Sequence, residues 1–159
     1  MALLGCRARI YSLSKEQIES LFPNLSGSVY SVASPQTAEY NCIAWAAGDH
    51  DKWWWPDQQN QYFWPPGIPR SEAVEAFTKA YESLGYTLRE DAEYEDGFEK
   101  IAIYVDFAGK PTHAARQLNP VLWTSKLGKL EDIEHTLYAL VGPQYGYVAA
   151  IMKRPKTFL

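Results

Sequence analysis

Two residues of this sequence carry side chains suited to nucleophilic catalysis. Cys42 lies in EYNCIAWAAGDHDKWWWP, residues 39–56, and His113 lies in PTHAARQL, residues 111–118. The apolar run after Cys42 predicts a short helix capped by Asn41, so the thiol belongs to its first turn. There the free backbone amides and the helix dipole favour a thiolate and help to hold an oxyanion. His113 would be the base, because such pairs meet in space rather than in sequence.

Each of these residues also has a structural interpretation. A free cysteine is often a small buried hydrophobe, and His113 would then be a surface or structural imidazole. Lys126, in WTSKLGK, either lowers the pKa of the thiol and receives an acidic group of a substrate, or is a solvated lysine in a loop. The residues alone leave these alternatives open.

Six aromatic residues follow the cysteine within a proline-rich segment: Trp53, Trp54, Trp55, Tyr62, Phe63 and Trp64. They have three interpretations. Their rings form a groove for a sugar, a proline-rich peptide or an aromatic ligand, they wall and dry an active-site cleft, or they anchor an irregular loop to the core. Anchoring is expected for at least half of them, with Trp54 or Trp55 bordering the site.

The other two histidines offer less chemistry. His50 stands between Asp49 and Asp51, but three neighbouring ligands have no established zinc spacing, so a metal site is not expected. Catalysis by a thiol requires no cofactor, and none is expected. His135, surrounded by acidic residues in EDIEHT, is expected to be exposed or to pack on a final helix.

The elements that must position these residues follow from hydrophobic periodicity. Ser14 and Gln17 read as a capping box, and helical spacing recurs through Leu130, Ile133 and Leu137. The expected helices are 15–22, 42–48, 71–84 and one through Leu130, Ile133, Leu137 and Leu140, and the expected strands are 86–89, 100–107, 112–118, 121–126 and 145–152. Residues 24–39 and 50–70 are expected to be loops. Helices first and strands later predict an α+β class, with N-terminal helices packed on a mainly antiparallel sheet.

Composition narrows the class of protein. A chain of 159 residues fits a single domain, with an N-terminal helix and loop over 1–39 and a core over 40–155. The net charge of −4 argues against nucleic acid as a partner, and no apolar run reaches membrane-spanning length. The first residues place an apolar patch before basic residues, the reverse of a secretory signal. We therefore expect a cytoplasmic protein whose two cysteines, Cys6 and Cys42, stay free. The sequence leaves the oligomeric state undetermined.

Several short motifs carry a resemblance to known families. The pieces YNCIAWA, IAIYVDFAGKPTHAARQ and VLWTSKLGK resemble those of papain-like thiol hydrolases of the NlpC type. The order NCxAWA, WWP, THAARQ and WTSKLG also resembles an uncharacterised group of small bacterial proteins, over about residues 40–155. The first resemblance implies a papain-like (NlpC-type) architecture, a cysteine opening a helix on an antiparallel sheet and a histidine on a following strand.

The same resemblance implies Cys42 as nucleophile and His113 as base. Such hydrolases place an Asn, Gln, Asp or His on the next strand, where this chain offers the hydroxyls of Thr124 and Ser125 to orient the imidazole. A hydroxyl stabilises an imidazolium less than a carboxylate does. Residues expected to contact a substrate are Asn41, Trp54, Trp55, Gln117 and Lys126.

Two functions follow from these observations. The first is a cysteine hydrolase or acyltransferase that acts on an amide or isopeptide bond of a peptide-like or amide-containing substrate through a dyad of Cys42 and His113. The alternative is a non-catalytic binding or interaction module that uses the Trp-rich loop, with Cys42 as a packing residue.

Overall fold

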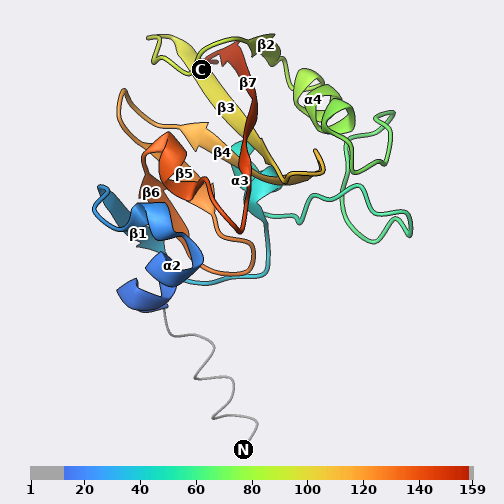
Figure 1. Ribbon diagram of the computed structural model, residues 1–159. Helices are drawn as coiled ribbons and strands as arrows, with labels where there is room; N and C mark the ends of the chain where they lie inside the picture. Colours follow the sequence, from blue (N-terminus) through green and yellow to red (C-terminus); the bar gives the residue numbers. More distant parts are fainter. Residues whose placement is uncertain (1–12, 158–159) are drawn as a thin grey trace, which may run out of the picture.

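The architecture is dominated by one antiparallel sheet of seven strands in the order β1-β6-β5-β4-β3-β7-β2 (Figure 1). The computed structural model describes residues 13–157, so Cys6 lies outside the described residues. Each neighbouring pair of strands is antiparallel. The strands are β1 Tyr30–Ser34, β2 Thr87–Arg89, β3 Phe98–Val105, β4 Pro111–Gln117, β5 Trp123–Lys126, β6 Asp132–His135 and β7 Tyr147–Pro155.

The helices of the described residues are short. Ser14 accepts a hydrogen bond from the backbone amide of Gln17 and the Gln17 side chain accepts one from the Ser14 amide, which confirms the predicted capping box. Asn41 caps the helix that begins at Cys42, as its sequence position predicts. The α-helices are α2 Lys15–Leu21, α3 Cys42–Ala46 and α4 Val74–Glu82, and the 3-10 helices are η1 Pro23–Leu25 and η2 Leu137–Leu140.

The predicted architecture of N-terminal helices packed on the sheet in a papain-like (NlpC-type) manner is wrong. Residues 30–34 and 132–135, expected in a loop and in a helix, are instead strands β1 and β6, which pair with each other. The apolar spacing through Ile133, Leu137 and Leu140 is satisfied by a strand followed by a 3-10 helix that pack into the same core. Seven strands and only a few short helices therefore replace the expected helical layer.

Alternate residues along the central strands separate into two apolar clusters. On β3, Ile101 and Ile103 pack with α3 and α4, whereas Ala102 and Tyr104 pack with α2, η1 and η2. This alternation is the period of two that a strand imposes. A residue's parity on these strands therefore decides which of the two clusters its side chain joins.

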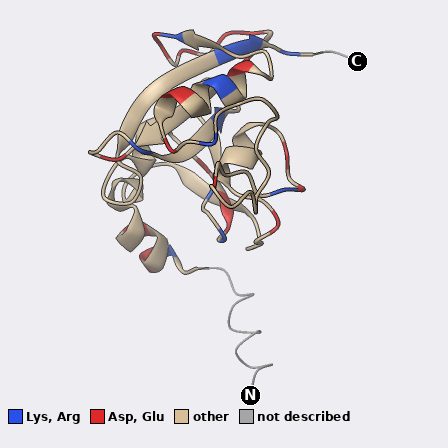
Figure 2. Ribbon diagram, turned by 90° about the vertical axis from the view of Figure 1, so that its right-hand side faces the viewer, with Lys and Arg blue, Asp and Glu red and all other residues tan. Residues whose placement is uncertain are grey.

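Charged residues of both signs are distributed along the side of the molecule drawn in Figure 2. One group is organised around Lys100, whose buried ammonium lies 3.1 Å from carboxylate oxygens of Asp91 and Glu95. Glu95 also accepts from Lys153 on β7 at 2.6 Å. These ion pairs tie the loop before β3 to the sheet. Within the described part of the chain, no helix is both long and apolar enough to span a bilayer.

Candidate functional site

A pocket of about 330 Å³ opens at the first turn of α3. Its size falls within the range of small-molecule and side-chain binding sites. Apolar and aromatic side chains dominate its wall, which draws on α3, the loop after it, the start of β4 and the turn before β7. The lining residues are Asn41, Cys42, Trp53, Trp55, Tyr62, Thr112, Gly128 and Tyr145.

The three consecutive tryptophans divide between the core and the pocket. The amide of Trp55 donates to Phe63 O at 3.0 Å and the amide of Phe63 donates to Trp53 O at 3.0 Å, so this segment is extended. Side chains of an extended chain alternate in direction. Trp54 is buried and donates its indole N–H to Asp49 at 2.9 Å, while Trp53 and Trp55 line the pocket. Of the two expected border residues, the structure places Trp55 at the pocket and Trp54 in the core.

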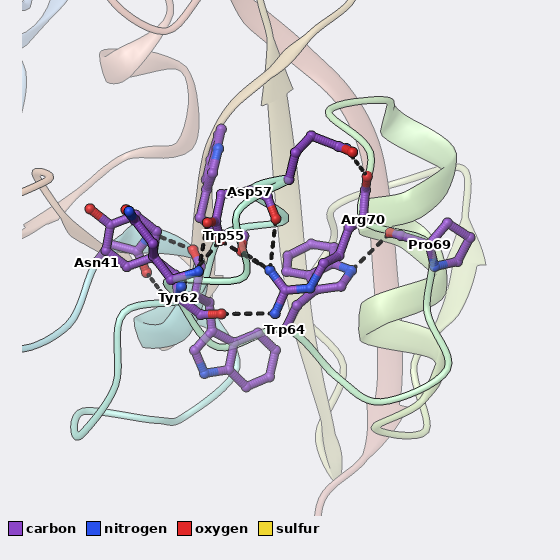
Figure 3. A network of polar contacts seen from close by, with 10 residues as sticks. Asn41, Trp55, Asp57, Tyr62, Trp64, Pro69 and Arg70 are labelled. Atoms are coloured by element: carbon purple, nitrogen blue, oxygen red, sulfur yellow. Dashed lines mark hydrogen bonds and ion pairs between the residues drawn. The ribbon is translucent and has the colours of Figure 1, made fainter.

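Arg70 holds the aromatic loop in place (Figure 3). Its guanidinium donates to the side chain of Asp57 at 3.0 Å, to Asp57 O at 3.0 Å and to Tyr62 O at 2.9 Å. Asp57 in turn accepts from the amides of Gln61 at 2.7 Å and Tyr62 at 3.1 Å. A planar fork with several donors suits this closure of a loop without regular secondary structure. The rings at the pocket are therefore positioned before any ligand arrives.

Asn41 joins the same loop to α3. Its side-chain oxygen accepts from the amides of Ala44 at 3.2 Å and Trp54 at 3.1 Å, and its amide nitrogen donates to Trp54 O at 2.7 Å. Both ends of the amide are thus engaged within the protein. Asn41, which was expected to contact a substrate, borders the pocket, but its side chain positions Cys42 and the loop rather than offering a free amide to a ligand.

Cys42 lines the pocket with only 6 % of its surface exposed. Burial raises the pKa of this thiol to about 11 and outweighs the backbone hydrogen bonds from Ala114 and Ile43 and the charge of Lys126, which act in the opposite direction. The first turn of α3 was expected to favour the thiolate. The structure instead keeps Cys42 protonated at neutral pH because its surroundings desolvate the charge.

His113 belongs to a different cluster. It precedes Ala114, which packs with Cys42, and its ring contacts Tyr104 at 5.1 Å on the opposite side of β4. Tyr145 stacks on the same ring at 4.0 Å, with 6° between the planes. Within residues 13–157 no hydrogen bond connects the Cys42 thiol to His113. The structure therefore does not assemble the expected dyad.

The partner of His113 is Ser125, one of the two predicted hydroxyl residues. His113 Nε2 lies 2.8 Å from Ser125 Oγ, and His135 Nε2 lies 2.7 Å from the same oxygen. His135 Nδ1 lies 2.7 Å from Thr136 O and must donate to it, so Ser125 donates to His135 and accepts from His113. His113 Nδ1 then carries a lone pair with no protein partner among the described residues. The side chains of His113, Ser125 and His135 are all completely buried.

The titration of the two histidines reflects that burial. Desolvation, with a smaller contribution from the nearby His135, holds the pKa of His113 well below its ordinary value. Desolvation likewise lowers the pKa of His135 to about 4, against the effect of Thr136 O. The expectation that His135 is exposed or packs on a helix is wrong, because it lies on strand β6 with its ring in the core.

The remaining predicted residues have other partners. Thr124 accepts the indole N–H of Trp45 at 2.9 Å, and Gln117 donates to Ala92 O at 2.8 Å at the far end of β4. Lys126 is buried rather than solvated, donates to Thr37 O at 2.7 Å and to Gly128 O, and lies over the Tyr40 ring. Burial lowers the pKa of Lys126 to about 8. None of these three side chains lines the pocket.

Sequence reasoning named Trp53 and Tyr62 only within the aromatic set and not as site residues, and it missed Thr112 and Tyr145 in the pocket and Arg70 as support of the loop. The available signal was the alternation within the WWW run, which puts Trp53 and Trp55 on one side. Tyr145 had no such signal, because it reaches the pocket from a turn that is more than a hundred residues from Cys42 along the chain.

Comparison with known proteins identifies one relationship. A family model described as a domain of unknown function, DUF7689, matches residues 31–153. No curated protein and no solved structure matches the chain. The residues described by the structure contain no group of three or more His, Cys, Asp or Glu side chains placed to hold a metal ion.

Proposed function

This chain belongs to the DUF7689 family, a domain of unknown function, and we propose that it acts as a non-catalytic binding module. The ligand enters the pocket at the first turn of α3 and packs against Trp53, Trp55 and Tyr62. One observation carries the proposal: aromatic rings that remain partly exposed are held around a preformed pocket by Arg70.

Energetics support this assignment. Large aromatic side chains contribute most when they are buried, and leaving them partly exposed forgoes that contribution. Trp54, in the same run, shows that the loop is able to bury an indole completely. The loop also uses Arg70 and Asn41 to hold Trp53 and Trp55 at the surface instead. Rigid rings fixed in advance lose little conformational entropy when a ligand binds.

The cysteine hydrolase or acyltransferase remains a second prediction, favoured by the position of Cys42 at the pocket in the first turn of α3. The geometry supports it less well. The raised pKa of the thiol disfavours the nucleophilic thiolate, and Ser125 rather than Cys42 is the partner of His113. Amide or isopeptide hydrolysis would require both groups to move to one side of β4.

Saturation-transfer NMR with two neutral ring compounds, N-acetylpyrrolidine and cyclohexanol, tests the binding proposal. We expect saturation transfer from the wild-type protein to both compounds, and its loss with a double variant, Trp53→Ala with Trp55→Ala. The matched control is Tyr138→Ala, which removes an exposed aromatic ring that lies on η2 and does not line the pocket. Equal transfer from the double variant, or no transfer from the wild type, would contradict the proposal.

A further inference from the structure

The hydrogen-bonding groups around the pocket are unequally distributed between donors and acceptors. Trp45, Trp54 and Trp64 each donate their indole N–H to a protein oxygen. Trp53 and Trp55, which line the pocket, have no such partner within residues 13–157, and neither N–H is among the buried atoms without a partner. Both donors are therefore reachable from solvent.

Two phenol hydroxyls add to this set. Tyr62 lies at the rim with 43 % of its surface exposed, and its hydroxyl has no hydrogen-bond partner in the described structure. The Tyr145 hydroxyl likewise has no partner there, and it is absent from the buried atoms without one. The residues that line the pocket thus carry two indole N–H groups and two phenol O–H groups that no protein atom of the described structure uses.

Charged acceptors are absent from the same wall. No carboxylate lines the pocket, and the Asn41 oxygen is already used by two backbone amides. The Thr112 hydroxyl donates to Tyr145 O at 2.6 Å, and Gly128 O accepts from Lys126. Hydroxyl oxygens both donate and accept, so the two indole N–H groups are what give the wall an excess of donors.

The wall of the pocket offers no partner to a cation. An aromatic box of this kind is a candidate site for a quaternary ammonium group. Here no acidic side chain lines the wall, and the nearby carboxylates of Asp132 and Glu131 interact with Lys126 instead. A positive ligand would therefore meet no counter-ion in the wall.

We propose that the ligand of this pocket is a proline-rich peptide segment in the polyproline II conformation. The inference rests on the binding module proposed above. A residue before proline and a proline itself together supply carbonyl acceptors, and proline has no backbone N–H. Its ring packs flat on indole and phenol faces, and the extended helix is ordered before it binds. An uncharged chain with carbonyl acceptors and flat apolar rings matches the aromatic faces and indole donors of a wall without carboxylates.

Isothermal titration with decaproline tests this inference. We expect saturable one-to-one binding, weakened roughly two- to tenfold by Tyr62→Phe and by Tyr145→Phe, since each removes one hydrogen bond and keeps the ring. Tyr138→Phe is the matched control and leaves the affinity unchanged, because Tyr138 does not line the pocket. Circular dichroism confirms that each variant is folded before it is titrated.

Three further ligands make the outcome decisive. A Gly-Ser decapeptide, an N-acetylglucosamine trimer and tetramethylammonium are titrated under the same conditions, and each should bind more weakly than decaproline. Tighter binding of any of them overturns the proline-rich assignment. If the neutral ring compounds bind but decaproline does not, this inference fails and the binding module stands. If neither binds, both fail.

Discussion

Two polar regions meet at the start of β4, and they differ in how their polar groups are satisfied. In the pocket, Trp53, Tyr62 and neighbouring aromatic residues present donors that no protein atom uses. Among His113, Ser125 and His135, hydrogen bonds of 2.7–2.8 Å connect buried side chains, and only His113 Nδ1 of these rings has no partner among the described residues. Free donors at a surface are available to a ligand, whereas buried hydrogen bonds stabilise and specify a fold. We therefore assign binding to the first region and stability to the second.

Tyr145 belongs to both regions. Its ring lines the pocket and also stacks on His113 at 4.0 Å. Gly142 and Gly146 flank its turn and exchange backbone hydrogen bonds of 2.9 and 2.8 Å. A side chain on the α-carbon of Gly146 would lie 1.9 Å from Val105 O, so only glycine permits this close approach. The turn thus fixes the one ring that the two regions share.

The largest expected effect is the loss of stability in acid. His135 has a pKa of about 4 in the folded chain and an ordinary value of 6.5, so the unfolded chain takes up the proton first. The full contribution is present above pH 6.5 and is lost as the pH falls towards 4, by about 3 kcal/mol for this residue. His113, whose pKa is also lowered, adds to the loss. Urea unfolding at pH 7.5 and 4.5 measures it.

His50 supplies the control for this pH dependence. Its side chain is 68 % exposed, so His50→Gln should leave the pH dependence unchanged. The assignment of the buried histidines to stability would be contradicted if His135→Gln retained the wild-type loss between pH 6.5 and 4.

The thiol of Cys42 should react slowly. With a pKa near 11 rather than 9, its thiolate fraction at pH 8 is about a hundredfold lower than that of an ordinary thiol. Iodoacetamide labelling, followed by mass spectrometry in a Cys6→Ser background, should show that rate difference and a rise towards pH 11. His113→Gln should not alter the profile. Rapid labelling at pH 7 that depends on His113 would instead favour the hydrolase prediction.

Replacing Ser125 should change the stability of the buried histidine region and leave ligand binding at the pocket unchanged. Ser125→Ala removes the hydroxyl that both histidine rings use, and leaving buried polar atoms unpaired should lower the free energy of unfolding by about 2 kcal/mol. Binding of a ligand to the folded variant should be unchanged. Chemical denaturation measures the first quantity and calorimetric titration the second. Ser31→Ala, on an exposed position of β1, should cost less than about 0.5 kcal/mol.

Replacing Arg70 should affect ligand binding more than stability, the opposite of the result expected for Ser125. Arg70→Ala removes hydrogen bonds to Asp57 and Tyr62 on a partly exposed loop, so stability should fall by only about 1 kcal/mol. Binding should weaken more than stability, because the aromatic rings lose their fixed positions. Arg89→Ala, on the exposed edge strand β2, is the matched control. A variant that keeps full affinity would show that the rings do not depend on Arg70.

Local signals in the sequence were sufficient for several elements. The capping box at Ser14, the Asn41 cap and the apolar run of β3 each depend on neighbouring residues and predicted their elements. Strand β1 escaped prediction because its pairing with β6 spans about a hundred residues. Strand β6 pairs with the nearby β5 as well, but its apolar spacing with Leu137 and Leu140 matched a helical period. The Arg70 network escaped for a different reason, since an irregular loop has no periodicity to reveal its contacts.

The candidate site shows a finer limit. Local sequence patterns placed Cys42 on a helix and His113 on a strand that do lie together. The resemblance offered Ser125 or Thr124 as the partner of His113, and the structure has Ser125 there. The position of His113 on β4 then decided that the dyad does not form, because side chains alternate between the two faces of a strand. Ala114 faces Cys42 and His113 faces away, and a period of two turns a one-residue difference into a change of face. Register of that kind depends on the whole sheet.

The most direct test of the account is a two-dimensional NMR spectrum of the ¹⁵N-labelled protein, observed at the tryptophan indole N–H groups during addition of decaproline. The account predicts shifts for Trp53 and Trp55, whose donors are free, and none for Trp54 and Trp64, whose donors are bonded within the protein. Unchanged Trp53 and Trp55 signals at saturating peptide, or shifts confined to Trp54 and Trp64, would contradict it.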